Sequence, residues 1–139
     1  MGKIPKDSWA IIERVIRRYP ESKMEYDDTL EISMHDSPGK NNTQILRGGN
    51  TVGNPTERIA LKLHTPRMER LSREIKAVEE VYNELPPEHQ KVIRTRYWSD
   101  RSRNKPYLWV ARFVDYEEGQ IKRISQKFVR NVGKKLGEI

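Results

Sequence analysis

Apolar residues recur at intervals of three and four along much of the chain, which is the spacing of one face of an α-helix. Near the N-terminus this face contains Trp9, Ile12, Val15, Ile16 and Tyr19. Asp7 or Ser8 can cap such a helix, and Pro20 is expected to end it. Residues 21–35 keep a weaker apolar period within an acidic stretch, and they predict a second helix.

The most regular pattern begins at Thr65-Pro66, a pair that favours a helix start because Pro is tolerated at the first helical position. Its apolar face contains Met68, Leu71, Ile75, Val78, Val81, Tyr82 and Leu85. This spacing predicts a helix of about twenty residues that lies in the core or packs against a partner helix. Asn54-Pro55-Thr56 carries the same start signal, whereas the Gly and Asn residues of 36–54 predict a loop.

Pro86-Pro87 stops this helix and starts another. Val92, Ile93 and Tyr97 of the new helix are expected to face inward, and its basic residues Lys91, Arg94 and Arg96 are expected on other faces. Because no stretch alternates as strands do, the expected fold class is all-α. The expected organisation is an N-terminal helical segment (1–35), a flexible loop (36–54), central helices (55–85) and a C-terminal domain (86–139).

The segment after Pro106 fits a helix-turn-helix, in which a second helix packs across a first through a small residue and a tight turn. Six positions form the expected core of this motif: Val110, Ala111, Val114, Tyr116, Ile121 and Ile124. Asp115 stands at the turn, where Gly is preferred because the chain often needs a positive φ. The second helix is expected to start at Glu117 or Glu118 and to reach Leu136, with Gly137 capping its end.

Charge changes this picture, because the whole formal excess of +7 lies in residues 86–139. A basic unit beside a neutral one favours a polyanion partner, although a merely solvated basic surface would look the same. The exposed side of the second motif helix gives six candidate base-reading residues: Glu118, Gly119, Gln120, Lys122, Arg123 and Gln126. Six further cations are candidate phosphate contacts: Arg101, Arg103, Lys105, Arg112, Lys127 and Arg130. Glu118 can instead be a helix-start charge that complements the helix dipole.

Composition removes several classes of protein. The chain has no Cys, which excludes disulfides, a thiol nucleophile and Cys-based metal sites. It has no apolar run long enough to span a membrane, and its first residues lack the apolar core of a signal peptide. Its three His residues are scattered, so we expect no metal, no cofactor and no enzyme activity. The acidic cluster Glu25, Asp27, Asp28 and Glu31 could in principle hold Mg²⁺ as nucleases do, although a solvated acidic face is the simpler interpretation.

Residues 67–88, followed by Ile93-Arg94-Thr95-Arg96-Tyr97-Trp98, resemble the phage transcriptional regulators of the RinA/ArpU type. In that family a similar block precedes a C-terminal helix-turn-helix related to the fourth region of sigma factors. Tyr19-Pro20-Glu21 and Asn54-Pro55-Thr56 also agree, so the resemblance covers residues 9–137. The starts of the two motif helices depart from the family, reading Pro106-Tyr107-Leu108-Trp109 and Glu117-Glu118-Gly119-Gln120.

The resemblance implies an activator of late phage genes that acts in the cytoplasm of a bacterial host. The expected partners are double-stranded DNA and, for the N-terminal helices, RNA polymerase or a second copy of the chain, with no membrane. One alternative is a small terminase subunit, which would use a similar motif to mark DNA for packaging. Metal-dependent nuclease activity at the acidic cluster is a further alternative.

Overall fold

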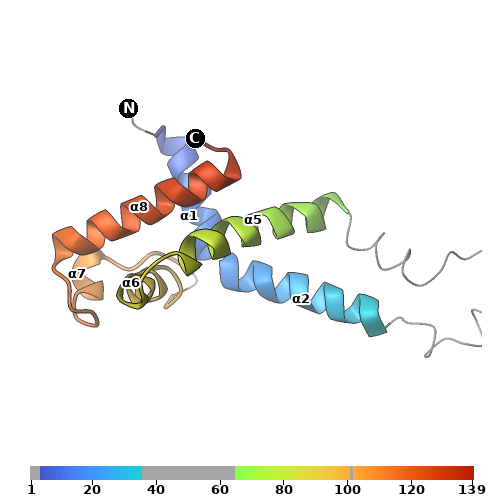
Figure 1. Cartoon of the computed structure of the whole chain (residues 1–139), viewed down its shortest axis with the longest axis horizontal. Helices are drawn as coiled ribbons and strands as arrows, with labels where there is room; N and C mark the ends of the chain where they lie inside the picture. The colour runs from blue at the N-terminus through green and yellow to red at the C-terminus, as the bar shows by residue number, and fades with distance from the viewer. Residues whose placement is uncertain (1–3, 36–64, 101) are drawn as a thin grey trace, which may run out of the picture. The chain divides into compact units, whose positions relative to one another are not determined.

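A computed structural model describes residues 4–35, 65–100 and 102–139, and every regular element in these ranges is a helix (Figure 1). The helices are α1 (Lys6–Arg17), α2 (Tyr19–His35), α5 (Pro66–Asn83), α6 (Pro87–Tyr97), α7 (Tyr107–Val110) and α8 (Glu118–Leu136). The predicted all-α class is therefore confirmed. Within the described ranges no helix is both long enough and apolar enough to cross a bilayer. The predicted loop at 36–54, the helix start at Asn54 and the candidate Arg101 lie outside the described residues.

The chain divides into two compact units, which we describe separately. The major unit contains Met1–Pro20 and Arg73–Ile139, and the minor unit contains Glu21–Ser72. These boundaries differ from the predicted ones at 35 and 85, because α1 packs on α8 and so belongs with the C-terminal part of the chain.

The core of the major unit forms where α1, α5, α6 and α8 meet. Its buried residues are Ile12, Val15, Ile16, Ala77, Val78, Val81, Ile93, Tyr97, Phe128, Val129 and Val132. They include most of the apolar positions expected on α1, on α6 and on the second half of α5. The apolar periods of these helices thus predicted correctly which faces are buried.

Two details of the N-terminal helices differ from expectation. Asp7 and Ser8 were expected to cap α1, but the cap residue is Pro5, whose carbonyl accepts from the Trp9 N–H at 2.9 Å. Pro20 was expected to end α1, but α1 ends at Arg17 and Pro20 lies in the first turn of α2. A proline is tolerated there because the first helical N–H groups have no partner inside the helix.

The start of α5 and the end of α8 follow the sequence signals. Thr65 Oγ1 accepts from the Met68 N–H at 3.2 Å at the start of α5. Gly137 follows α8 with a φ of 80°, the left-handed conformation that favours glycine at a helix end. The crossing of α1 over α8 depends on a second glycine, because a Cβ built on Gly133 would lie only 2.5 Å from Ile12 Cδ1.

Candidate nucleic-acid interface

A small second core holds α6, α7 and α8 together at one end of the major unit. Val92, Val110 and Ile121, one from each helix, are fully buried and in contact. Six partly buried residues pack against these three: Tyr107, Trp109, Ala111, Val114, Tyr116 and Ile124. The structure therefore brings all six predicted core positions of the helix-turn-helix together.

The connection between α7 and α8 is longer than a tight turn. α7 spans only Tyr107–Val110, and two turn bonds extend it, from the Arg112 N–H to the Trp109 carbonyl at 3.1 Å and from the Phe113 N–H to the Val110 carbonyl at 2.9 Å. Asp115 was expected to tolerate a positive φ, but in the described part of the chain only Gly137 has one. The bend over residues 114–117 spreads the change of direction, so a left-handed residue is not needed.

A capping box fixes the start of α8. It joins Glu117 and Gln120, and the Glu117 N–H donates to Gln120 Oε1 at 2.9 Å. This contact gives Gln120, a candidate base-reading residue, a structural role in the free protein. Glu118 lies in the first turn, where a negative charge complements the helix dipole.

The exposed side of α8 is basic, since the helix contains six Lys or Arg residues and one acidic residue. Arg123, Lys127, Arg130 and Lys134 are exposed and follow one another at spacings of four, three and four, which places them on one face. We call these four residues the basic stripe. At a rise of about 1.5 Å per residue the stripe is about 16 Å long. Lys134 was not among the residues that the sequence singled out.

The cations near the start of the stripe are available to a ligand. Within the described residues, Lys122, Arg123, Lys127 and Arg130 form no ion pair with a carboxylate, whereas Lys135 pairs with Glu80 at 3.2 Å. Gln126 is half-buried and Gly119 is exposed. A Cβ on Gly119 would have only Arg123 Nη1 nearby, at 4.0 Å, so the backbone there is open to close approach.

A family model described as "Protein of unknown function (DUF722)" matches residues 11–134. The chain belongs to this DUF722 family. No curated protein and no solved structure matches the chain. The matched range in this DUF722 member includes α6, α7 and nearly all of α8, so the segment predicted to be a helix-turn-helix lies inside the matched range.

Two candidate phosphate contacts between α6 and α7, Arg103 and Lys105, already have a local partner. Asp100 Oδ2 lies 3.6 Å from Arg103 Nε and 3.5 Å from Lys105 Nζ. Hydrogen bonds from the Ser102 hydroxyl and N–H, helped by the Lys105 charge, lower the pKa of Asp100 from 3.8 to about 2. Lys105 also lies 4.9 Å from the centre of the Trp109 ring. Arg112, on the turn after α7, is exposed.

Arg96 is the main departure from the predicted arrangement of α6. It was expected on an outer face but is buried, with its guanidinium 4.0 Å from the centre of the Tyr107 ring. Arg96 Nη1 donates to the Lys105 carbonyl, and Arg96 Nη2 lies 3.9 Å from Glu13 Oε2 on α1. The face of the Tyr107 ring and the carboxylate of Glu13, a residue far away in the sequence, thus allow the Arg96 charge to be buried. The residue type alone could not indicate this burial.

Glu13 connects the same cluster to the segment before α7. Its Oε2 accepts from Asn104 Nδ2 at 3.0 Å and from the Tyr97 hydroxyl at 3.4 Å. Burial raises the pKa of the Tyr97 hydroxyl well above its ordinary value. Through Glu13 and Arg96, α1 therefore fixes the position from which α7 begins.

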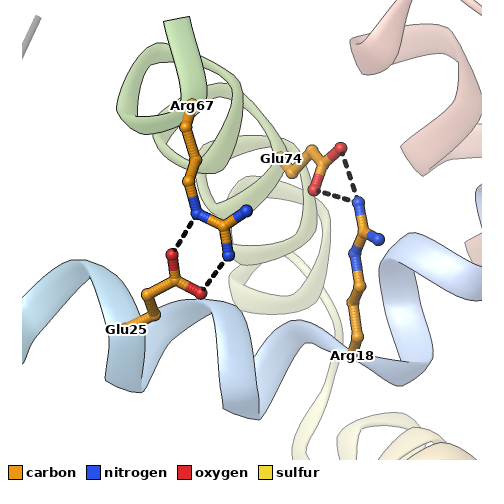
Figure 2. A network of polar contacts seen from close by, with 4 residues as sticks. All are labelled: Arg18, Glu25, Arg67 and Glu74. Carbon is orange, nitrogen blue, oxygen red and sulfur yellow. Dashed lines mark hydrogen bonds and ion pairs between the residues drawn. The ribbon is translucent and has the colours of Figure 1, made fainter. Parts of the chain in front are cut away.

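Two carboxylates of the acidic stretch of α2, Glu25 and Asp27, pair with basic side chains. In the minor unit Glu25 accepts two hydrogen bonds from Arg67, at 2.5 and 2.8 Å, and this contact raises the pKa of Arg67 (Figure 2). Lys23 Nζ lies 3.8 Å from Asp27 Oδ1. Among the described residues no three His, Asp or Glu side chains lie close enough together to hold a metal ion.

The other pair drawn in Figure 2 belongs to the major unit, where Arg18 Nη2 lies 3.0 and 3.1 Å from the two carboxylate oxygens of Glu74. Glu74 is buried, and this contact joins the end of α1 to α5. The pair therefore helps to hold α1 and α5 together.

Proposed function

We propose that this DUF722 member is a sequence-specific DNA-binding transcriptional regulator that places the first half of α8 in a DNA major groove. The observation that carries the proposal is a row of exposed cations without carboxylate partners on a helix that has its own three-helix core. Such a helix keeps its orientation while its outer face is covered by a ligand. Helix-turn-helix proteins bind DNA with this element of structure.

The base-reading part of the proposal rests on the first three turns of α8. Lys122 and Arg123 are exposed donors of the kind that pair with guanine O6 and N7, and Gln126 offers an amide suited to adenine. Gly119 allows the backbone to approach the DNA closely. Gln120 would have to exchange its bond to Glu117 for a bond to a base, so we give it a lesser role.

Phosphate contacts belong further along the helix and at the turn. Lys127, Arg130 and Lys134 form the part of the basic stripe that follows Arg123, and all three are exposed. Arg112 offers a further exposed cation after α7. Contacts of this kind hold a protein in register on the duplex but carry little sequence information.

The biological role is proposed from the resemblance to RinA/ArpU-type regulators, which suggests an activator of late phage genes in a bacterial cytoplasm. RNA polymerase or a second copy would be the protein partner. Selection of genomic fragments by the purified protein tests this role. Recovery of promoter regions supports it, and recovery of a single packaging site would replace it with the terminase alternative.

DNA binding itself is tested by fluorescence anisotropy with a selected fragment over a series of salt concentrations. Removing two contacts by Lys122→Ala with Arg123→Ala should weaken binding at least about tenfold. The logarithm of affinity should still fall steeply with the logarithm of salt in this variant, because the proposed phosphate contacts of Lys127, Arg130 and Lys134 remain. The matched control is Arg73→Ala with Lys76→Ala, which removes the same charge from the exposed face of α5.

The control variant should bind as the unchanged protein does. If both double variants lose affinity equally, the binding is a general charge effect and the assignment to α8 is wrong. Affinity that does not change between low and moderate salt would exclude DNA binding through these cations.

A further inference from the structure

Large apolar side chains lie on the surface of the major unit at α7 and the turn that follows it. Leu108 is 67% exposed and Phe113 is 48% exposed. Trp109 is half-buried, and the centre of its ring lies 4.6 Å from that of Phe113. Leu108 and Phe113 take no part in the small core of α6, α7 and α8. Large apolar side chains that gather on one part of a surface mark a contact with another molecule.

A basic group borders these side chains on the Trp109 side. Lys105 Nζ lies 4.9 Å from the centre of the Trp109 ring. Asp100 Oδ2 lies 3.5 Å from Lys105 Nζ and 3.6 Å from Arg103 Nε, so these three charged groups lie together. Two cations and one carboxylate leave this group with a net charge of +1.

An acidic group borders the same side chains on the Phe113 side. Phe113 lines a hollow of about 290 Å³ together with the turn residue Asp115 and with Glu88 and Lys91 of α6. Glu88 and Asp115 are exposed, and neither forms an ion pair with any residue that the structure describes. Two carboxylates and one cation leave this group with a net charge of −1.

We define the α7 strip as the surface that runs from Arg103 and Lys105 through Trp109 and Phe113 to Asp115. An aromatic centre with charged groups around it is typical of protein–protein interfaces. The carboxylates of the acidic group disfavour phosphate, so a nucleic acid is a poor occupant of the whole strip. Because its two ends carry opposite net charges, the strip is complementary to itself when one copy is turned end to end against another.

We propose that the α7 strip is the contact surface of a symmetric dimer of this chain. In a two-fold contact the same surface serves both copies, so the basic end of each copy meets the acidic end of the other. Trp109 and Phe113 of both copies then pack at the centre. The inference rests on the proposed function in one respect, since it decides between the two protein partners proposed there. Two α8 helices in one dimer would suit paired half-sites on DNA.

Sedimentation velocity of the full chain without DNA tests the proposal. Chain concentrations up to about 1 mM are needed, because small interfaces give weak dimers. The unchanged chain should pass from monomer to dimer as its concentration rises. Leu108→Ser with Phe113→Ser should weaken the dimer at least about tenfold, since anchors at the centre of an interface carry most of its binding energy.

The matched control is Met24→Ser with Ile32→Ser, which removes two exposed apolar side chains from α2. This control should dimerise as the unchanged chain does. A monomer at every concentration would overturn the proposal and leave the strip to a different protein. An equal loss of dimer in the two double variants would show that the α7 strip is not the interface.

A charge exchange tests the two-fold arrangement without changing the apolar centre. Arg103→Glu brings an acid towards the partner's Asp115, and Asp115→Lys brings a cation towards the partner's Arg103. Each change should weaken the dimer at least about threefold, because the mismatch occurs twice in a symmetric contact. The chain with both changes should dimerise as the unchanged chain does, since opposite charges face each other again. If this chain dimerises as weakly as the single variants, the two ends do not meet and the proposal is wrong.

Anisotropy with a selected DNA fragment, measured on the same samples, separates this inference from the proposed function. A dimer that binds no fragment would refute DNA binding and leave the α7 contact standing. A chain that binds its fragment but stays monomeric in sedimentation would refute the dimer and leave DNA binding standing.

Discussion

Gly133→Ala should destabilise the major unit, although the same substitution usually stabilises a helix. Gly133 lies in α8, where α1 crosses it. An added Cβ would lie 2.5 Å from Ile12 Cδ1 and 2.8 Å from Ile139 Cδ1. Ordinary carbon contacts are about 3.5–4.0 Å, so roughly 1 Å of overlap must be relieved.

The two contacts differ in how easily they yield. Ile139 is 55% exposed and can turn away, whereas Ile12 is completely buried in the main core. Overpacking of a core costs about 1–3 kcal/mol, and replacing a helical Gly by Ala returns about 1 kcal/mol. We therefore expect a net loss of about 1 kcal/mol in the free energy of unfolding, given by the excess of a mid-range overlap cost over the helix gain.

Urea denaturation followed by circular dichroism measures this loss, and Gly119→Ala in the same helix is the matched control. A Cβ on Gly119 meets only Arg123 Nη1, at 4.0 Å, so this variant should be unchanged or more stable. Ile12→Val removes the contacted Cδ1 atom. The cost of Gly133→Ala should therefore fall when both changes are made, a coupling that a double-mutant cycle detects.

If Gly133→Ala stabilises the protein as much as Gly119→Ala does, α1 does not approach α8 as closely as described. A cost that is the same with Ile12 and with Val at position 12 would show that the overlap lies elsewhere. Either result would refute the reasoning from the α1–α8 crossing.

Three further predictions concern the ends and supports of α6, α7 and α8. Asp100 should titrate at about pH 2 in carbon-detected magnetic resonance, and Ser102→Ala should move this value towards 3.8, because the Ser102 bonds lower the Asp100 pKa. Since the folded-state pKa is depressed, the stabilisation from Asp100 is present above about pH 4 and is lost as the pH falls towards 2. Arg96→Ala should lower the free energy of unfolding, measured by urea denaturation, by about 3 kcal/mol because it leaves Glu13 with an unmatched charge. Arg94→Ala, at an exposed position, should lower it by under about 1 kcal/mol. Equal losses in the two variants would contradict the buried role of Arg96. Gly137→Ala should cost about 1 kcal/mol from its positive φ alone, since no atom lies within 4 Å of the added Cβ, and an unchanged unfolding midpoint would count against this cap.

The sequence predicted α8 almost completely because its determinants are local. The apolar face repeats over the whole helix, Glu117 supplies the cap, and Gly137 supplies the left-handed end. Thr65-Pro66 and Pro86-Pro87 likewise start α5 and α6 where expected. Signals within a few residues of a helix end can be read without knowledge of the tertiary structure.

Features that depend on distant residues could not be predicted in the same way. Arg96 is a surface residue by type, and only Glu13 and the Tyr107 ring explain its burial. The cavity lined in part by Tyr19, Tyr82 and Trp98 combines residues that lie far apart in the sequence, so no single stretch of sequence reveals it. The candidate base-reading residues were chosen for exposure, which the structure bears out for most of them, but their binding role stays a prediction.

The packing of α1 on α8 also orders events during synthesis of the chain. The contact from Asn104 to Glu13 spans 91 residues, and the core partners of Ile12 on α8 follow even later. Until those residues leave the ribosome, the part of the apolar face of α1 that packs on α8 has no partner and remains open to chaperones or to other chains. A premature stop before Phe128 would therefore yield a chain in which the α8 side of the core is missing and α1 is only partly covered. Such a product should be degraded or aggregate rather than accumulate as a folded fragment.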